Sequence, residues 1–164
     1  MIYPIIYIFA LVAANLLVAT IGPWFSVVNS FVLIGLDLTL RDKLHDKWNG
    51  NPIKIGGLIV IAGAVSYLLN PASGQIAIAS VVAFTLSMVA DSFVYQKLKE
   101  KSWEKRTTGS NLAGAAVDSL TFPTIAFGGL MPEIVAMQFA SKVIGGFIWS
   151  KLIQKVKHDT ARNH

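Results

Sequence analysis

The stretch that decides the fold class is residues 2–21, IYPIIYIFALVAANLLVATI, in which no charged residue interrupts the run. A helix rises about 1.5 Å per residue, so a run of this length matches the ~30 Å hydrocarbon core of a bilayer. No basic segment precedes the run, and no small-residue cleavage site separates it from the next apolar run. We therefore expect a transmembrane helix that stays in the protein, not a signal peptide.

The same kind of run recurs along the chain. Of its 164 residues, 54% are hydrophobic and 14% are charged, whereas an ordinary soluble domain carries about 25% charged residues. The pattern predicts an all-α membrane protein, with six transmembrane helices in one bundle that forms a single domain, 1–164. The expected helices are residues 2–21, 24–40, 54–70, 75–96, 110–130 and 133–152.

The positions of the basic residues predict a topology. Lysine and arginine gather in the second, fourth and sixth connections or tails and at the run ends beside them, and the other three connections contain neither; Lys142 is the one basic residue in the middle of a run. By the positive-inside rule the basic side is cytoplasmic, which gives a multi-pass protein of the cytoplasmic (inner) membrane with both termini in the cytoplasm. Because this rule accounts for the basic clusters, we expect no nucleic-acid partner. The basic residues are Arg41, Lys43, Lys47, Lys54, Lys97, Lys99, Lys101, Lys105, Arg106, Lys151, Lys155, Lys157 and Arg162.

Two polar connections are expected between these helices. Residues 41–52 end in an Asn-Gly-Asn-Pro turn pattern, and residues 97–109 are interpreted as a cytoplasmic extension of the fourth helix. Both are expected to face solvent.

Several chemistries have no support in the sequence. There is no cysteine, and His45, His158 and His164 lack metal-ligand spacing. No Walker loop, dinucleotide fingerprint, HExxH or GxSxG pattern occurs. We therefore expect no enzyme activity, no catalytic residue, no metal and no cofactor.

Asp118 and Lys142 are the ionisable residues expected nearest the membrane midplane. A charged side chain there costs at least about 2.5–3.5 kcal/mol, so each needs a partner or a function. The two lie at similar depth on antiparallel helices, and we expect them to pair. Helical periodicity adds Asn111 and Phe122 to the stripe of Asp118, and it adds Gln138, Gly145 and Trp149 to that of Lys142. Two interpretations stay open: a binding site, and a salt bridge that only orients the helices.

Other polar residues inside the runs are further candidates for a cavity. They are the uncharged Asn15, Asn29 and Gln75. Asp37 and Asp91 also lie inside runs, but toward the cytoplasmic side, where interfacial water is within reach, and a structural or interfacial role stays open for both. The aromatic candidates are Tyr7, Trp24, Phe84 and Phe93. Pro123, expected in the middle of the fifth helix, removes a backbone donor close to Asp118 and predicts a bend there.

The segment from Arg106 to Gly129, RTTGSNLAGAAVDSLTFPTIAFGG, resembles the most characteristic segment of the VUT family of vitamin uptake transporters. Residues 32–50 and 81–99 also look like their family counterparts. The matching positions are Arg106, Ser110, Asn111, Val117, Asp118, Ser119 and Phe122.

The resemblance implies a fold similar to the substrate-binding S-components of energy-coupling-factor transporters. It also implies a queuosine precursor as substrate, 7-cyano-7-deazaguanine or its aminomethyl relative. A carboxylate can accept hydrogen bonds from the guanine edge, and an aromatic ring can stack on the base. The expected substrate-binding residues are Asp118, Asn111, Phe122, Lys142, Gln138, Asn15, Asn29 and Asp91.

Three functional hypotheses follow. The first is an importer of a 7-deazapurine that needs no other protein. The second is an S-component-like module for a vitamin or purine that needs an ATP-driven partner, docked on Ala10 and Ala14. The third is a small membrane protein that transports nothing. Besides the small-molecule substrate and the lipid bilayer, a second copy of the chain stays open as a partner.

Overall fold

A computed structural model describes residues 2–34, 36–37, 40, 44, 47–48 and 51–162. Helices are the regular elements of this described part. They are α1 (Ile2–Ile21), α2 (Phe25–Asn29), the π-helix η1 (Ser30–Ile34), α4 (Pro52–Leu69), the 3-10 helix η2 (Pro71–Ser73), α5 (Gly74–Lys97), α6 (Trp103–Ala126) and α7 (Pro132–Arg162).

Some of the sequence predictions fall beyond this part. Arg41, Lys43, His45, Asn49, Gly50 and His164 lie outside the described residues. The side chains of Arg106, Lys151, Lys155, Lys157, His158 and Arg162 also lie outside what the structure describes.

Most helix starts lie within two residues of the predicted ones, but α7 ends at Arg162, ten residues past the predicted end at 152. The first helix has the predicted bounds, and α4 begins two residues earlier than predicted because Asn51 caps it. The Asn51 side chain accepts from the amides of Ile53 and Lys54, and Pro52 occupies the first turn, where its missing N–H is no loss.

The connection at residues 97–109 was predicted wrongly. It does not extend the fourth helix: α5 ends at Lys97, and the chain turns through hydrogen bonds from Lys99 N to Gln96 O and from Lys101 N to Leu98 O. The helix α6 then begins at Trp103, preceded by Ser102 in extended conformation (φ −56°, ψ 151°). Serine favours the position before a helix, so the polar residues after it form the first turns of α6.

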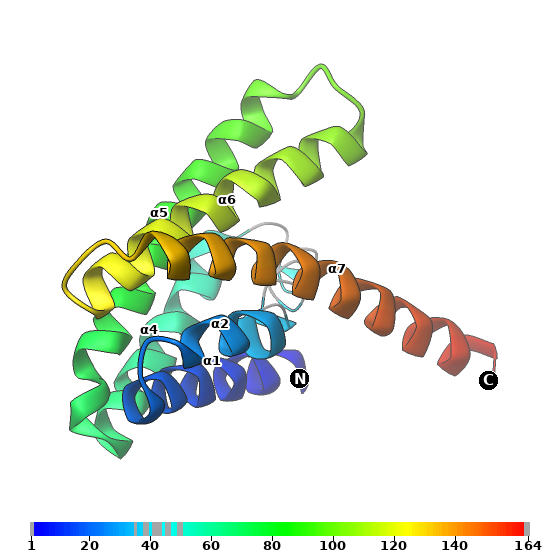
Figure 1. Cartoon of the computed structure of the whole chain (residues 1–164). Coiled ribbons are helices and arrows are strands. Elements are labelled where there is room, and N and C mark those ends of the chain that lie inside the picture. Colours follow the sequence, from blue (N-terminus) through cyan, green and yellow to red (C-terminus); the bar gives the residue numbers. More distant parts are fainter. Residues whose placement is uncertain are drawn as a thin grey trace.

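Figure 1 shows a body of packed helices from which a hairpin and an arm project. The helix α1 packs against α4, and α7 packs against α2, η1 and α6. The helices α5 and α6 form a long antiparallel hairpin, whose far end stands clear of the other elements, and α7 continues past the body as an arm. The site described below lies where the near half of the hairpin meets the other helices.

The buried apolar side chains form two clusters beside that meeting point. The larger joins α1 to α4 around Tyr7, Leu11 and Ile59, and it includes Leu40 and Leu44. The smaller is built from Val18, Ile76, Ala79 and Ala126, which hold α1, α5 and the end of α6 together.

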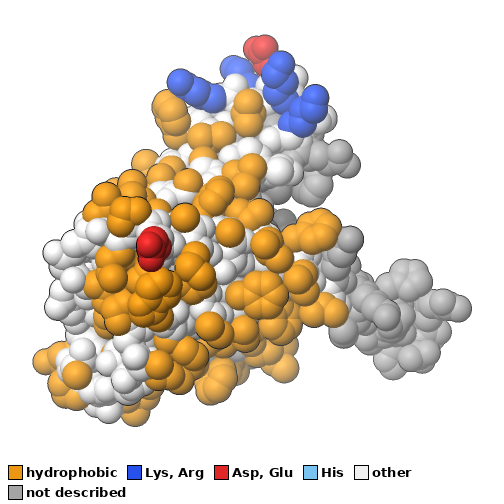
Figure 2. Space-filling view, viewed as in Figure 1, with side chains coloured by type: hydrophobic (Ala, Val, Ile, Leu, Met, Phe, Trp, Pro, Cys, Tyr) orange, Lys and Arg blue, Asp and Glu red, His pale blue; other side chains and the backbone are white. Residues whose placement is uncertain are grey.

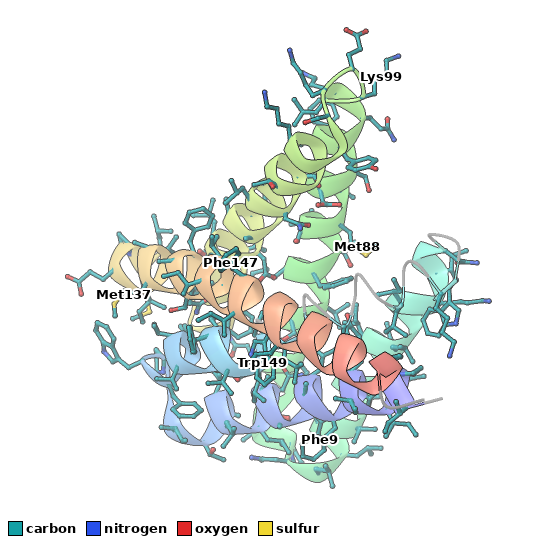
Figure 3. All side chains as sticks on the ribbon, turned by 90° about the vertical axis from the view of Figure 1, so that its right-hand side faces the viewer. Phe9, Met88, Lys99, Met137, Phe147 and Trp149 are labelled. Atoms are coloured by element: carbon teal, nitrogen blue, oxygen red, sulfur yellow. The ribbon has the colours of Figure 1, made fainter. Side chains whose placement is uncertain are left out.

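Much of the outer surface is apolar, as Figure 2 shows, and the visible lysines gather at the tip of the α5–α6 hairpin. Figure 3 places Lys99 at this tip and Phe9 on the outer side of α1, where 71% of the Phe9 side chain is exposed. Exposed apolar area on this scale is unusual in a soluble monomer and suits contact with lipid.

Two helices of the described chain are long and apolar enough to cross a bilayer on their own, Ile2–Ile21 and Pro71–Lys97. Phe25–Ile34 and Ile53–Leu69 are apolar but shorter. The prediction of an all-helical protein is confirmed for the described residues, while the six transmembrane spans stay a prediction.

Candidate functional site

A cavity with apolar and polar lining residues lies between α1, α2, η1, α4, α5, α6 and α7. Its volume is about 50 Å³, which is more than the roughly 10–15 Å³ that one water molecule needs. Apolar side chains such as Leu11, Ile34 and Ile59 form part of its wall. The polar and aromatic lining residues are Asn15, Ser26, Asn29, Ser30, Asp37, Ser80, Phe84, Ser87, Asp118, Phe122, Gln138 and Lys142.

The predicted ion pair is present on one side of this cavity. Lys142 Nζ of α7 lies 2.6 Å from Asp118 Oδ2 of α6. The lysine is 2% exposed and the aspartate 22%, so the carboxylate is the more accessible member of the pair. Lys142 Nζ also donates to Ser119 Oγ at 3.0 Å and to Gln138 Oε1 at 3.1 Å. The buried cation therefore has both a counter-charge and hydrogen-bond acceptors, as burial requires.

Gln138 connects this pair to the second helix. Its side chain is fully buried, and its Nε2 donates to Ser26 Oγ at 2.7 Å. Residues 138 and 142 are one turn apart on α7, so both face the cavity. The network thus ties α7 to α6 through the ion pair and to α2 through the amide.

Asn15 is the centre of a second hydrogen-bond network, which connects α1, α4 and α5. Its Nδ2 donates to Ser66 Oγ at 3.2 Å, and its Oδ1 accepts from Ser80 Oγ at 2.6 Å. Ser66 in turn donates to the carbonyl of Ala62 at 2.8 Å. These contacts link α1 with α4 and α5, so that Asn15 braces the cavity wall.

Asn29 differs from Asn15 although both amides line the cavity. Its Nδ2 donates to Ala14 O at 3.2 Å. Its Oδ1 is buried and finds no hydrogen-bond donor among the residues that the structure describes. A buried polar atom of this kind is uncommon and needs an explanation.

Six of the eight predicted binding residues lie around the cavity, and two do not. Asn111 is on the same face of α6 as Asp118 but two turns closer to the hairpin tip, and it is exposed. Asp91 lies one turn beyond the cavity-lining Ser87 and packs beside Gly114 of α6. The cavity residues are Asp118, Phe122, Lys142, Gln138, Asn15 and Asn29.

Several lining residues were not predicted as site residues. On the second run, Ser26, Ser30 and Asp37 recur at helical spacing with Asn29, and Asp37 is only 3% exposed, so it does not reach toward interfacial water as expected. On α5, Ser80 and Ser87 are likewise at helical spacing and line the cavity. Small hydroxyl residues on one helix face were the pattern that could have indicated them.

Other expectations are corrected by the structure. Pro123 lies in the last turn of α6, not in the middle, because the helix begins earlier and ends at Ala126. Gln75 is exposed and donates to Ile125 O at 3.0 Å instead of lining the cavity.

The prediction that α1 carries a docking surface for a partner is wrong as well. Ala10 and Ala14 are 1% and 2% exposed, so they are covered by the chain's own helices. Small residues that allow close helix approach are here used within the chain.

The aromatic candidates divide between cavity, core and surface. Phe84 and Phe122 line the cavity, and Phe122 also meets Phe127 edge to face with ring centroids 6.1 Å apart. Tyr7 is part of the core, while Trp24 and Phe93 are 58% and 57% exposed.

The cavity combines a partly accessible carboxylate, amide oxygens, hydroxyls and two aromatic rings. The rings can stack on a planar group, and the carboxylate, amide and hydroxyl oxygens can accept hydrogen bonds from N–H donors. Among the described residues, no group of three His, Asp or Glu side chains is placed to hold a metal ion.

Comparison with known proteins gives one family. Residues 1–155 match the family model described as "Putative vitamin uptake transporter". Neither the curated proteins nor the solved structures contain a match to this chain.

Proposed function

Because the chain belongs to the vitamin uptake transporter family, we propose that it imports a 7-deazapurine, 7-cyano-7-deazaguanine or a close relative, bound in the cavity beside Asp118. The family and the apolar helices support the general statement that the chain is a membrane protein of a family that takes up small molecules. The substrate itself is the proposal.

The main observation in support of this substrate is the accessibility of the Asp118 carboxylate. Asp118 and Lys142 both line the cavity, and the carboxylate is the more accessible member of the pair, 22% exposed against 2% for the lysine. Both oxygens of a carboxylate can accept hydrogen bonds. The N1–H and the exocyclic amine of a guanine-type edge present two donors side by side, which match such a carboxylate.

The aromatic rings support the same class of ligand. Phe84 of α5 and Phe122 of α6 both line the cavity, and a flat base gains by stacking on such rings. Phe122 lies one turn after Asp118, so the acceptor and a ring come from the same face of α6.

Binding by the purified protein tests the proposal. We expect 7-cyano-7-deazaguanine to raise the melting temperature of the wild type and to bind measurably by calorimetry. Asp118→Asn replaces one acceptor by a donor that faces the ligand's own N–H. Its dissociation constant should rise at least about tenfold, since that factor corresponds to roughly 1.4 kcal/mol.

A matched control lies nearby on the same helix. Leu120→Ala changes a side chain that is 51% exposed on α6 and does not line the cavity, so its affinity should equal that of the wild type. Equal affinity of folded Asp118→Asn and wild type would show that the carboxylate is structural.

We also propose that the chain works in the cytoplasmic membrane with six spans and without an energy-coupling protein. The burial of Ala10 and Ala14 removes the surface that a coupling protein was expected to use. Uptake of the labelled 7-deazapurine by cells that express this chain alone tests this. Uptake that required a co-expressed ATPase complex would favour the binding-module hypothesis.

A further inference from the structure

The hydrogen-bonding capacity of Lys142 is fully used within the protein. An ammonium group has three N–H donors and no acceptor. Its three acceptors are Asp118 Oδ2, Ser119 Oγ and Gln138 Oε1, at 2.6, 3.0 and 3.1 Å. With 2% of the side chain exposed, Lys142 has no proton left for a ligand. It therefore positions Asp118 and Gln138 and does not itself bind the ligand.

The orientation of the Asn29 amide is set by its neighbour. The carbonyl oxygen of Ala14 only accepts hydrogen bonds, so the nitrogen of the Asn29 amide must face it, as the 3.2 Å contact shows. The amide oxygen then points to the other side of the group. Asn29 is 5% exposed and lines the cavity, and its oxygen lacks a donor within the described part of the chain.

Asn15 shows that an amide oxygen without a hydrogen-bond donor is not a general property of the side chains that line the cavity. Its oxygen accepts from Ser80 at 2.6 Å, and its nitrogen donates to Ser66 at 3.2 Å. Two amides of the same type thus line one cavity, one whose oxygen accepts a hydrogen bond and one whose buried oxygen has no donor among the described residues. A buried acceptor without a donor is costly unless something binds to it.

We propose that Asn29 Oδ1 is a specificity-determining acceptor, which takes a hydrogen bond from an N–H of the transported molecule that Asp118 does not hold. The proposal rests on the proposed function and deepens it. With the donors of Lys142 used within the protein, a negatively charged group, the Asp118 carboxylate, remains for a ligand. The site therefore selects a neutral or cationic ligand rich in N–H donors and rejects carboxylate or phosphate compounds.

A 7-deazaguanine has donors to spare for this acceptor. If Asp118 engages N1–H and one hydrogen of the 2-amino group, the second amino hydrogen and the N9–H remain. Two analogues of 7-cyano-7-deazaguanine each remove one of these: one lacks the 2-amino group, and the other carries a methyl group on N9.

The experiment compares the three ligands by calorimetry on the purified protein. The wild type should bind both analogues more weakly than the parent compound. Asn29→Leu keeps the size of the side chain without its polar atoms. It should reduce the discrimination against one of the two analogues at least roughly fivefold, the worth of one hydrogen bond, and leave the other unchanged. Comparison of ligands within one variant cancels any effect on folding.

Asn15→Leu is the matched control. It removes an amide whose oxygen is already engaged, so it should lower the melting temperature and weaken all three ligands equally. Equal weakening of all three ligands in Asn29→Leu would overturn the role of Asn29 while leaving the proposed substrate intact. A wild type that binds none of the three would instead overturn the proposed function, and this inference with it.

Discussion

Lys142 Nζ lies 2.6 Å from Asp118 Oδ2, yet the lysine is 2% exposed and the aspartate 22%. The two ends of this ion pair are therefore buried unequally. Removing either partner leaves a charge behind, and the consequence depends on which charge remains.

We expect Asp118→Asn to destabilise the protein more than Lys142→Met. The first leaves a buried cation without its counter-charge, a change that costs about 3–5 kcal/mol in buried pairs. The second leaves a carboxylate that the cavity can hydrate. Urea unfolding of the two variants in the same detergent gives the order.

The double variant checks that the pair acts as a unit. Asp118→Asn combined with Lys142→Met should lose less stability than the two single variants together, because no isolated charge remains. Strictly additive losses would contradict a direct interaction.

The ion pair could be predicted from the sequence because each charge stands alone in an apolar run. A buried charge needs a partner, and Asp118 and Lys142 were at matching depth. The prediction for Asn111 shows the limit of periodicity. Periodicity gives the face of α6 on which a residue lies but not how far along the helix the cavity extends, and Asn111 lies exposed beyond its end.

Other features needed the three-dimensional structure. Whether Ala10 and Ala14 face a partner or the chain's own helices cannot be decided from small-residue spacing alone. The states of Asn15 and Asn29 are likewise set by Ser66, Ser80 and Ala14, whose positions beside them depend on tertiary packing. The end of α5 depended on turn residues at 98–102, where helix propensity is a weak guide.

The topology prediction can be tested with single cysteines in this cysteine-free chain. Ser102, at the exposed tip of the hairpin, should be shielded from an impermeant thiol reagent added outside intact cells, because the basic side is expected in the cytoplasm. Ala72, exposed between α4 and α5, should react. Ser73 is unsuitable because it is fully buried and donates to Ser66 O at 2.8 Å.

Labelling in opened cells provides the control, since both cysteines should then react. Reaction of the Ser102→Cys protein in intact cells would contradict the predicted orientation.

The cap at Asn51 should contribute measurably to α4. Asn51→Ala removes the acceptor for two amides in the first turn and should lower the free energy of unfolding by about 1 kcal/mol. Asn51→Asp keeps an acceptor and should retain most of the stability in the same denaturant titration.

Neighbouring glycines on α7 should respond in opposite ways to alanine. A Cβ on Gly145 would run into the backbone carbonyl of Phe31 in η1, which cannot move aside as a side chain could. The helices α7 and η1 would have to separate beside the cavity, and overpacking of this kind costs about 1–3 kcal/mol. A Cβ on Gly146 would meet no heavy atom within 4 Å, and alanine is favoured over glycine inside a helix by about 0.5–1 kcal/mol. Gly145→Ala should therefore lower the melting temperature and Gly146→Ala should hold or raise it. A Gly145→Ala protein as stable as the wild type would mean that α7 does not pack this closely against Phe31.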